Sequence, residues 1–163
     1  MADARNLSER ERLIADVEPL LFAESDMRQV IAAVDALAAD NLNGDLCRAL
    51  ETAIVACYAR AFTENKVGKL GAKWKPSDPD QRKLHHELIR VRNKVYAHTD
   101  RIGARQIVDA GAMLGLGRVA YIEAWHPLDR EKLPAIRALA ADQDKRFTAR
   151  IEEIGLALSA DGS

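Results

Sequence analysis

The chain has little cysteine, which excludes a disulfide framework. Its only two cysteines, Cys47 and Cys57, are ten residues apart in a segment with helical periodicity. Ten residues of one helix span about 15 Å, which is beyond the reach of a disulfide bond. We expect both cysteines to be reduced and to fill space in the core.

Long apolar runs are also missing. The longest one lies around residues 54–59 and is far shorter than the ~20 residues that a membrane-spanning helix needs. The first residues, MADARNLSERER, lack the apolar stretch of an export signal. We therefore expect a cytoplasmic protein with no membrane partner.

The net charge is only −1, which argues against a protein that coats nucleic acid indiscriminately. The charges are nevertheless unevenly distributed. Residues 66–105 contain 11 Lys and Arg against 4 Asp and Glu, a net of +7, and the rest of the chain carries −8. The first part of this basic segment has four lysines, Lys66, Lys69, Lys73 and Lys75. We interpret them as attracting an RNA backbone, and a merely solvated loop is the alternative.

The composition, with 48% hydrophobic and 30% charged residues, predicts one folded domain over residues 1–163. Apolar residues recur at helical intervals, which predicts an all-α, up-and-down bundle of four to five helices. The expected helices span 7–24 and 26–39 in an N-terminal part over 1–40, and about 43–65, 79–98 and 129–158 in a core bundle over 43–158. Between 105 and 125, β-branched and aromatic residues predict a short strand or hairpin.

Local signals set the expected helix boundaries and faces. A break at Ser25 and Asp26 separates the first two helices, and Pro19 is expected to kink the first. Ser77 or Asp78 is expected to cap the 79–98 helix. The expected core-facing residues are Leu46, Leu50, Ile54, Cys57 and Tyr58 in the third helix and Leu84, Leu88, Val91 and Val95 in the fourth.

Several familiar motifs are absent from the sequence. There is no Gly-x-Ser-x-Gly turn, and the glycine pairs at 68/71 and 111/115 lack the spacing of a phosphate loop. His85 and His86 precede Glu87, a combination that suggests a metal site. Adjacent helix residues point ~100° apart, however, and neither histidine has a metal-binding residue four positions later. We expect a solvated helix face there, and no metal or cofactor.

The segment 90–100, RVRNKVYAHTD, carries the most informative pattern. It resembles the signature of the HEPN superfamily, in which Arg-x(4–6)-His near a helix end, with a polar residue after the Arg, marks ribonucleases. Here Arg92, Asn93 and His98 fit that spacing. The resemblance is greatest to toxin-type and abortive-infection proteins of prokaryotes. It implies a metal-independent endoribonuclease, a homodimer, and a toxin or phage-defence role with a possible cognate antitoxin. Some toxin members have a Tyr where this chain has Asp100.

The residue types of this segment suit metal-free RNA cleavage. Histidine suits proton transfer because its ordinary pKa of ~6.5 is near the working pH, so His98 is the expected acid or base. Arginine binds phosphate through a fixed fork of donors, which is the role expected of Arg92. By resemblance, Asn93 orients His98 or the phosphate. Lys94 and Arg90 are expected to add phosphate affinity.

The expected helix geometry separates the two main residues of the motif. On one regular helix, Arg92 and His98 are ~120° and ~9 Å apart, too far for one shared phosphate. The resemblance implies the solution, since HEPN nucleases are commonly homodimers whose motif helices meet at the two-fold axis. We therefore expect Arg92 of one chain to work with His98 of the other.

Other interpretations remain open for each of these residues. His98 could simply cap the helix end, and Arg92 could be a surface or ion-pair residue. Trp74 could stack on a base, although a packing role is the simpler interpretation. At the level of the whole chain, the alternatives are a non-catalytic HEPN-like module that binds RNA, nucleotide or a partner protein, and a helical scaffold with chance similarity to the motif.

Overall fold

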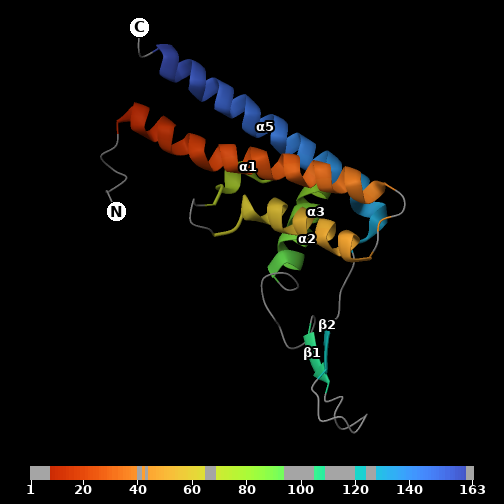
Figure 1. Ribbon diagram of the computed structural model, residues 1–163. Coiled ribbons are helices and arrows are strands. Elements are labelled where there is room, and N and C mark those ends of the chain that lie inside the picture. The colour runs from red at the N-terminus through yellow and green to blue at the C-terminus, as the bar shows by residue number, and fades with distance from the viewer. Residues whose placement is uncertain are drawn as a thin grey trace.

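The protein is a helical bundle, seen in a computed structural model that describes residues 8–39, 42, 44–64, 69–93, 105–108, 120–123 and 128–160. Within these ranges there are four α-helices: α1 (Glu9–Ala38), α2 (Gly44–Arg60), α3 (Pro79–Val91) and α5 (Leu133–Ala160). Short 3-10 helices cover Ala72–Trp74 and Arg130–Lys132. The prediction of an all-α bundle is therefore confirmed (Figure 1).

α1 is one continuous helix, so the expected separation into 7–24 and 26–39 is wrong. Ser8 starts it with a capping box, in which the Ser8 hydroxyl accepts from the Glu11 amide and the Glu11 carboxylate accepts from the Ser8 amide. The helix continues through Pro19 and Asp26 because tertiary contacts outweigh local preference. The Asp26 carboxylate is buried and pairs with Arg60 of α2 at 3.2 Å. Buried residues on both sides of this point join α1 to the core: Leu20, Ala23, Met27, Val30, Val34 and Leu37.

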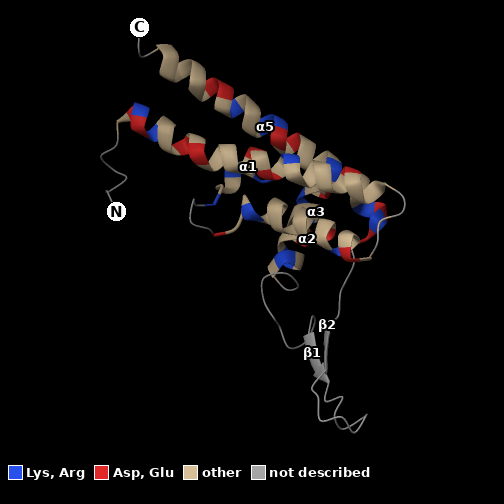
Figure 2. Ribbon diagram, in the orientation of Figure 1, with Lys and Arg blue, Asp and Glu red and all other residues tan. Residues whose placement is uncertain are grey.

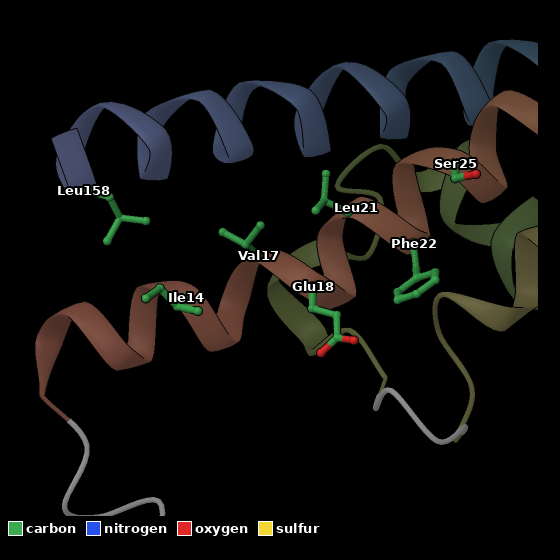
Figure 3. A pocket seen from close by; sticks show the side chains of 7 residues that line it. All are labelled: Ile14, Val17, Glu18, Leu21, Phe22, Ser25 and Leu158. Atoms are coloured by element: carbon green, nitrogen blue, oxygen red, sulfur yellow. The ribbon is translucent and has the colours of Figure 1, made fainter.

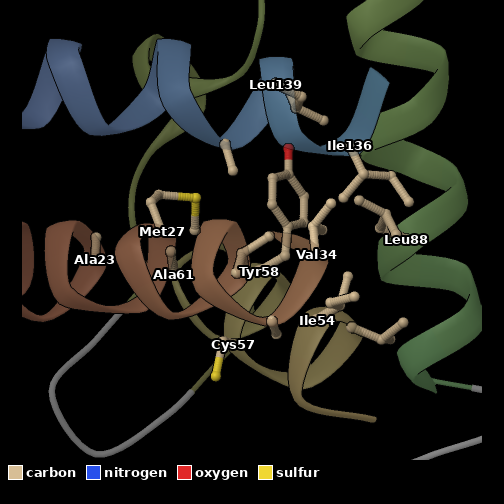
Figure 4. Close-up of a cluster of buried hydrophobic side chains, with 14 of the residues drawn as sticks. Ala23, Met27, Val34, Ile54, Cys57, Tyr58, Ala61, Leu88, Ile136 and Leu139 are labelled. Carbon is tan, nitrogen blue, oxygen red and sulfur yellow. The ribbon is translucent and has the colours of Figure 1, made fainter. Parts of the chain in front are cut away.

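α1 runs antiparallel to α5 on one side and to α2 on the other (Figure 1). Polar contacts connect the two long helices, including a bidentate pair of Arg137 with Asp35 at 2.7 and 3.1 Å. The Tyr58 ring rises from α2 into the space between α1 and α5 (Figure 4). Ile54, Cys57 and Tyr58 are buried as predicted, whereas Leu46 is 44% exposed, so its assignment to the core face is wrong.

The N-terminal forty residues belong to the same core as the rest of the bundle. The buried cluster combines residues of α1 with residues of α2, α3 and α5. α3 lies across the other helices rather than along them (Figures 1 and 4). Its start is as predicted, because the Asp78 carboxylate accepts from the Gln81 amide at 2.8 Å and Pro79 occupies the first turn. α3 ends at Val91, and Arg92 and Asn93 continue in a wider helical turn.

A hairpin confirms the expectation for residues 105–125. β1 (Arg105–Val108) pairs antiparallel with β2 (Ala120–Glu123), with Arg105 opposite Glu123. Residues 128–130 are joined to the bundle by two hydrogen bonds. The Glu51 carboxylate accepts from the Leu128 amide at 3.1 Å, and Arg130 donates to the Leu37 carbonyl at 2.9 Å. These contacts fix the start of α5.

Two simpler expectations can also be compared with the structure. Cys47 and Cys57 are both free and buried, which confirms their interpretation as reduced core residues. In the described ranges, no helix combines the length and the apolar character needed to cross a bilayer.

Candidate active site

α3 leads into the motif segment and contains its first two residues, and two buried side chains, His85 and Leu88, hold the helix against the bundle. The His85 ring meets Phe62 and Tyr58 edge-on, with ring centres 4.7 and 5.8 Å apart. The expectation of a solvated helix face is therefore wrong for His85, although His86 is exposed. His85 lies three residues before Leu88 on the same face of the helix. Extending the apolar pattern to include it would have revealed this face from the sequence.

His85 is a structural residue rather than a proton carrier. Its Nδ1 shares a 2.9 Å hydrogen bond with the Tyr58 hydroxyl, and its Nε2 has no partner in the described part of the chain. Burial, with smaller contributions from the nearby charges of His86 and Lys75, lowers the pKa of His85 to about 4. The same burial raises the pKa of the Tyr58 hydroxyl. Both groups are therefore neutral at pH 7, and their hydrogen bond positions α3.

Arg92 continues the row of His85 and Leu88 beyond the end of α3. It follows His85 by seven residues, which is about two helical turns on nearly the same face. Its side chain is accordingly half-buried. The Nη1 atom of Arg92 donates to the Asn93 Oδ1 atom at 3.1 Å. Among the described residues, no carboxylate pairs with Arg92, so the interpretation of Arg92 as an ion-pair residue gains no support there.

The structure describes only some of the other motif residues. Arg90 is exposed on the last turn of α3. His98, Lys94 and Lys66 lie outside the described residues. Figure 2 shows basic positions at the end of α3 and mixed charges along α1 and α5. The described part of the candidate site thus consists of Arg90, Arg92 and Asn93.

The lysines of the basic segment lie toward the opposite end of α3. Lys69, Lys73 and Lys75 are all exposed and precede this helix, whereas Arg92 follows it. Thirteen residues of helix place these ends about 20 Å apart. Lys69 also pairs with Glu64 at 3.0 Å, a surface contact of small energetic value. The described structure therefore does not bring these lysines to Arg92.

Trp74 packs against α5, as its simpler interpretation predicts. Its ring meets Phe147 edge-on with centres 5.3 Å apart, and the Lys73 ammonium lies 5.7 Å from the ring centre. Arg146 fixes this loop by donating to the carbonyl groups of Lys73 and Trp74 at 3.0 and 3.3 Å. Sequence reasoning did not identify Arg146, since its partners are backbone atoms far away in the chain.

A polar cluster between α1 and α2, with Asp26 and Cys57 buried and Arg60 exposed, is the second feature that sequence reasoning missed. Arg60 contacts both Asp26 at 3.2 Å and the Cys57 sulfur at 3.2 Å. Burial raises the pKa of Asp26 to about 6, and the Arg60 charge offsets only part of this effect. Burial likewise raises the pKa of the Cys57 thiol, so this thiol is not an activated nucleophile.

The described residues contain no group of three side chains arranged to hold a metal ion. The chain matches no protein-family model, no curated protein and no solved structure. Its function is therefore inferred from its own side chains.

Proposed function

We propose that the protein is a metal-independent endoribonuclease of HEPN type that acts as a cytoplasmic homodimer in a toxin or phage-defence role. One observation supports this most: Arg92 is half-buried at the end of α3, is held by Asn93, and has no carboxylate partner in the described part of the chain. A guanidinium in this state offers its remaining N–H donors to a phosphate group.

In the proposed reaction, the ribose 2′-oxygen attacks the adjacent phosphorus atom. A general base removes the 2′-hydroxyl proton, and a general acid protonates the departing 5′-oxygen. The products carry a 2′,3′-cyclic phosphate and a 5′-hydroxyl. His98 performs the proton transfers, and Arg92, contributed by the other chain, stabilises the negative charge that builds up on the phosphate in the transition state. Asn93 orients the Arg92 guanidinium.

The test is cleavage of a single-stranded RNA by the full chain in the presence of EDTA. We expect cleavage to persist and to leave 2′,3′-cyclic phosphate ends. Because a positioned acid or base contributes about 10²–10⁴-fold, His98→Ala should reduce the rate at least ~100-fold. Arg92→Lys keeps the charge but loses the fork, so it should also reduce the rate.

The control is Arg137→Ala, which removes an arginine of α5 that is paired with Asp35 of α1 and does not belong to the motif segment. This variant should cleave at the rate of the unchanged chain. Loss of all activity on chelation would refute the metal-free mechanism. A His98→Ala variant that binds RNA as before and loses less than tenfold in rate would instead identify a non-catalytic RNA-binding module.

A further inference from the structure

The ends of the two long helices form an arm, and no third helix of the described part of the chain covers the groove between them. The arm consists of residues 9–22 of α1 and 147–160 of α5, which run side by side past the end of α2 (Figure 1). Leu20 is the first buried residue of α1. Three large apolar side chains of this part of α1 are nevertheless open to solvent: Ile14, Leu21 and Phe22 are 47%, 47% and 54% exposed.

These side chains border an apolar groove between the two helices. Val17 and Leu21 point from α1 toward α5, and Leu158 points from α5 toward α1 (Figure 3). The groove has a volume of about 610 Å³, and Glu18 is the one charged residue among those that line it. Contiguous exposed apolar surfaces are typical of interaction sites when they are large, so the groove and the exposed apolar side chains beside it are a candidate for one.

We propose that this groove is covered by the same arm of a second copy of the chain. Helices bury an apolar stripe by packing against another layer, and two antiparallel helices supply only one layer. A second, identical arm completes a four-helix bundle with the apolar side chains inside. The same surface then serves both partners, which is the usual arrangement in a two-fold dimer.

The size of the arm suits a small dimer contact. Fourteen residues of helix are about 21 Å long, and two adjacent helices present a face about 20 Å wide. The flat outline of this face is therefore about 420 Å², roughly half of the ~800 Å² of accessible surface that each partner of a standard-size interface buries, and the relief of the side chains adds to it. The exposed aromatic ring of Phe22 adds a large apolar contribution.

The charges of α1 are arranged to fit an antiparallel copy. Arg10, Ile14 and Glu18 are all exposed and are spaced four residues apart on one face. If the two-fold axis passes at Ile14, Arg10 of each chain faces Glu18 of the other. A second copy therefore brings opposite charges together on both sides of the apolar centre.

This interface is independent of the proposed ribonuclease activity. Figure 1 shows the free ends of the arm away from α3. Contact through the arms leaves α3 open, so motif helices that pair across a two-fold axis use a separate surface. Loss of the arm contact should therefore leave a dimer joined through α3 if α3 pairs as well, and a monomer if it does not.

The test measures the mass of the full chain in solution by sedimentation or light scattering at micromolar concentration. Leu21→Glu should halve the mass while the circular dichroism of the helices is retained. Leu156→Glu is the matched control, because Leu156 is 74% exposed and does not line the groove. Ile14→Glu repeats the test in a part of α1 without buried residues. Unchanged mass in both groove variants, or a wild-type chain that is monomeric, would overturn the proposal.

Charge reversal tests the antiparallel arrangement. Glu18→Arg places arginines against each other at both ends of the contact and should raise the dissociation constant about tenfold. The double variant Arg10→Glu with Glu18→Arg restores opposite charges and should return to within about threefold of the unchanged chain. The two residues are about 12 Å apart within one helix, so they cannot rescue each other inside one chain. Failure of this rescue would refute the arrangement.

Discussion

Two buried ionisable side chains, Asp26 on α1 and His85 on α3, respond in opposite ways to acidification. The folded-state pKa of Asp26 is about 6, above its ordinary value of 3.8, so its contribution to stability is present below pH 3.8 and is lost as the pH rises through 6. The folded-state pKa of His85 is about 4, below its ordinary value of 6.5, so its contribution is present above pH 6.5 and is lost as the pH falls through 4. Each effect is on the order of 3 kcal/mol at full titration.

The two contributions should largely cancel between pH 6 and pH 4 in the unchanged chain, and single variants should separate them. Asp26→Asn removes the gain on acidification, so its free energy of unfolding should fall more steeply than that of the unchanged chain. His85→Phe removes the loss on acidification and leaves the gain from Asp26. The free energy of unfolding of this variant should therefore increase as the pH falls from 6 to 4, whereas that of the unchanged chain stays nearly constant. Urea unfolding at half-unit steps of pH measures both slopes. Parallel pH profiles for all three proteins would contradict this assignment.

At the scale of elements, α3 is held by a small buried surface and yet carries Arg92. Its buried side chains are His85 and Leu88. Leu88→Ala should lower the free energy of unfolding by about 2–5 kcal/mol, because it removes apolar contacts and leaves a cavity under the helix. Urea denaturation measures this change. Leu84→Ala is the matched control, since Leu84 is only partly buried in the same helix and should lose less. An equal loss in both variants would show that Leu88 has no special role.

Sequence reasoning succeeded where one local signal determines an element. Asp78 and Pro79 start α3, and β-branched residues form the hairpin. Sequence reasoning failed where contacts with residues far away in the chain determine the helix boundary or the burial of a side chain. Asp26 was interpreted as a helix break because aspartate is a poor helix former, but a carboxylate paired with Arg60 is compatible with a continuous α1. His85 was assigned to solvent because its partners, Tyr58 and Phe62, belong to another helix.

The site was predictable only as a set of residue types. The pattern of segment 90–100 selected Arg92 and Asn93, and the structure shows them in contact. It did not reveal that Arg92 continues the core-facing row of α3, because the core face had been placed on Leu84 rather than on His85. The direction of α3 across the bundle also follows from packing, which no spacing in the sequence encodes.

At the scale of the whole molecule, the separation of the lysines from Arg92 predicts that the proposed RNA affinity and the proposed cleavage can be changed independently of each other. Changing Lys69, Lys73 and Lys75 to Ala should weaken binding of single-stranded RNA. It should also reduce the slope of log affinity against log salt by up to about 2, since each neutralised phosphate contributes about 0.7. The cleavage rate at saturating RNA should stay within about threefold. Binding titrations from 50 to 200 mM salt and single-turnover kinetics measure the two properties. An unchanged slope would show that this loop is only solvated.

The pairing of α1 with α5 has a consequence for the order of events during synthesis. α1 leaves the ribosome before α5, one of its two principal partners, so the part of its apolar row that faces α5 stays uncovered until α5 has been translated. Contacts between α1 and α5 also make the mean sequence separation of contacts large, which slows folding. Nascent chains that stop before α5 therefore lack the support that closes the bundle around α3, and the proposed nuclease becomes competent only after α5 has been translated.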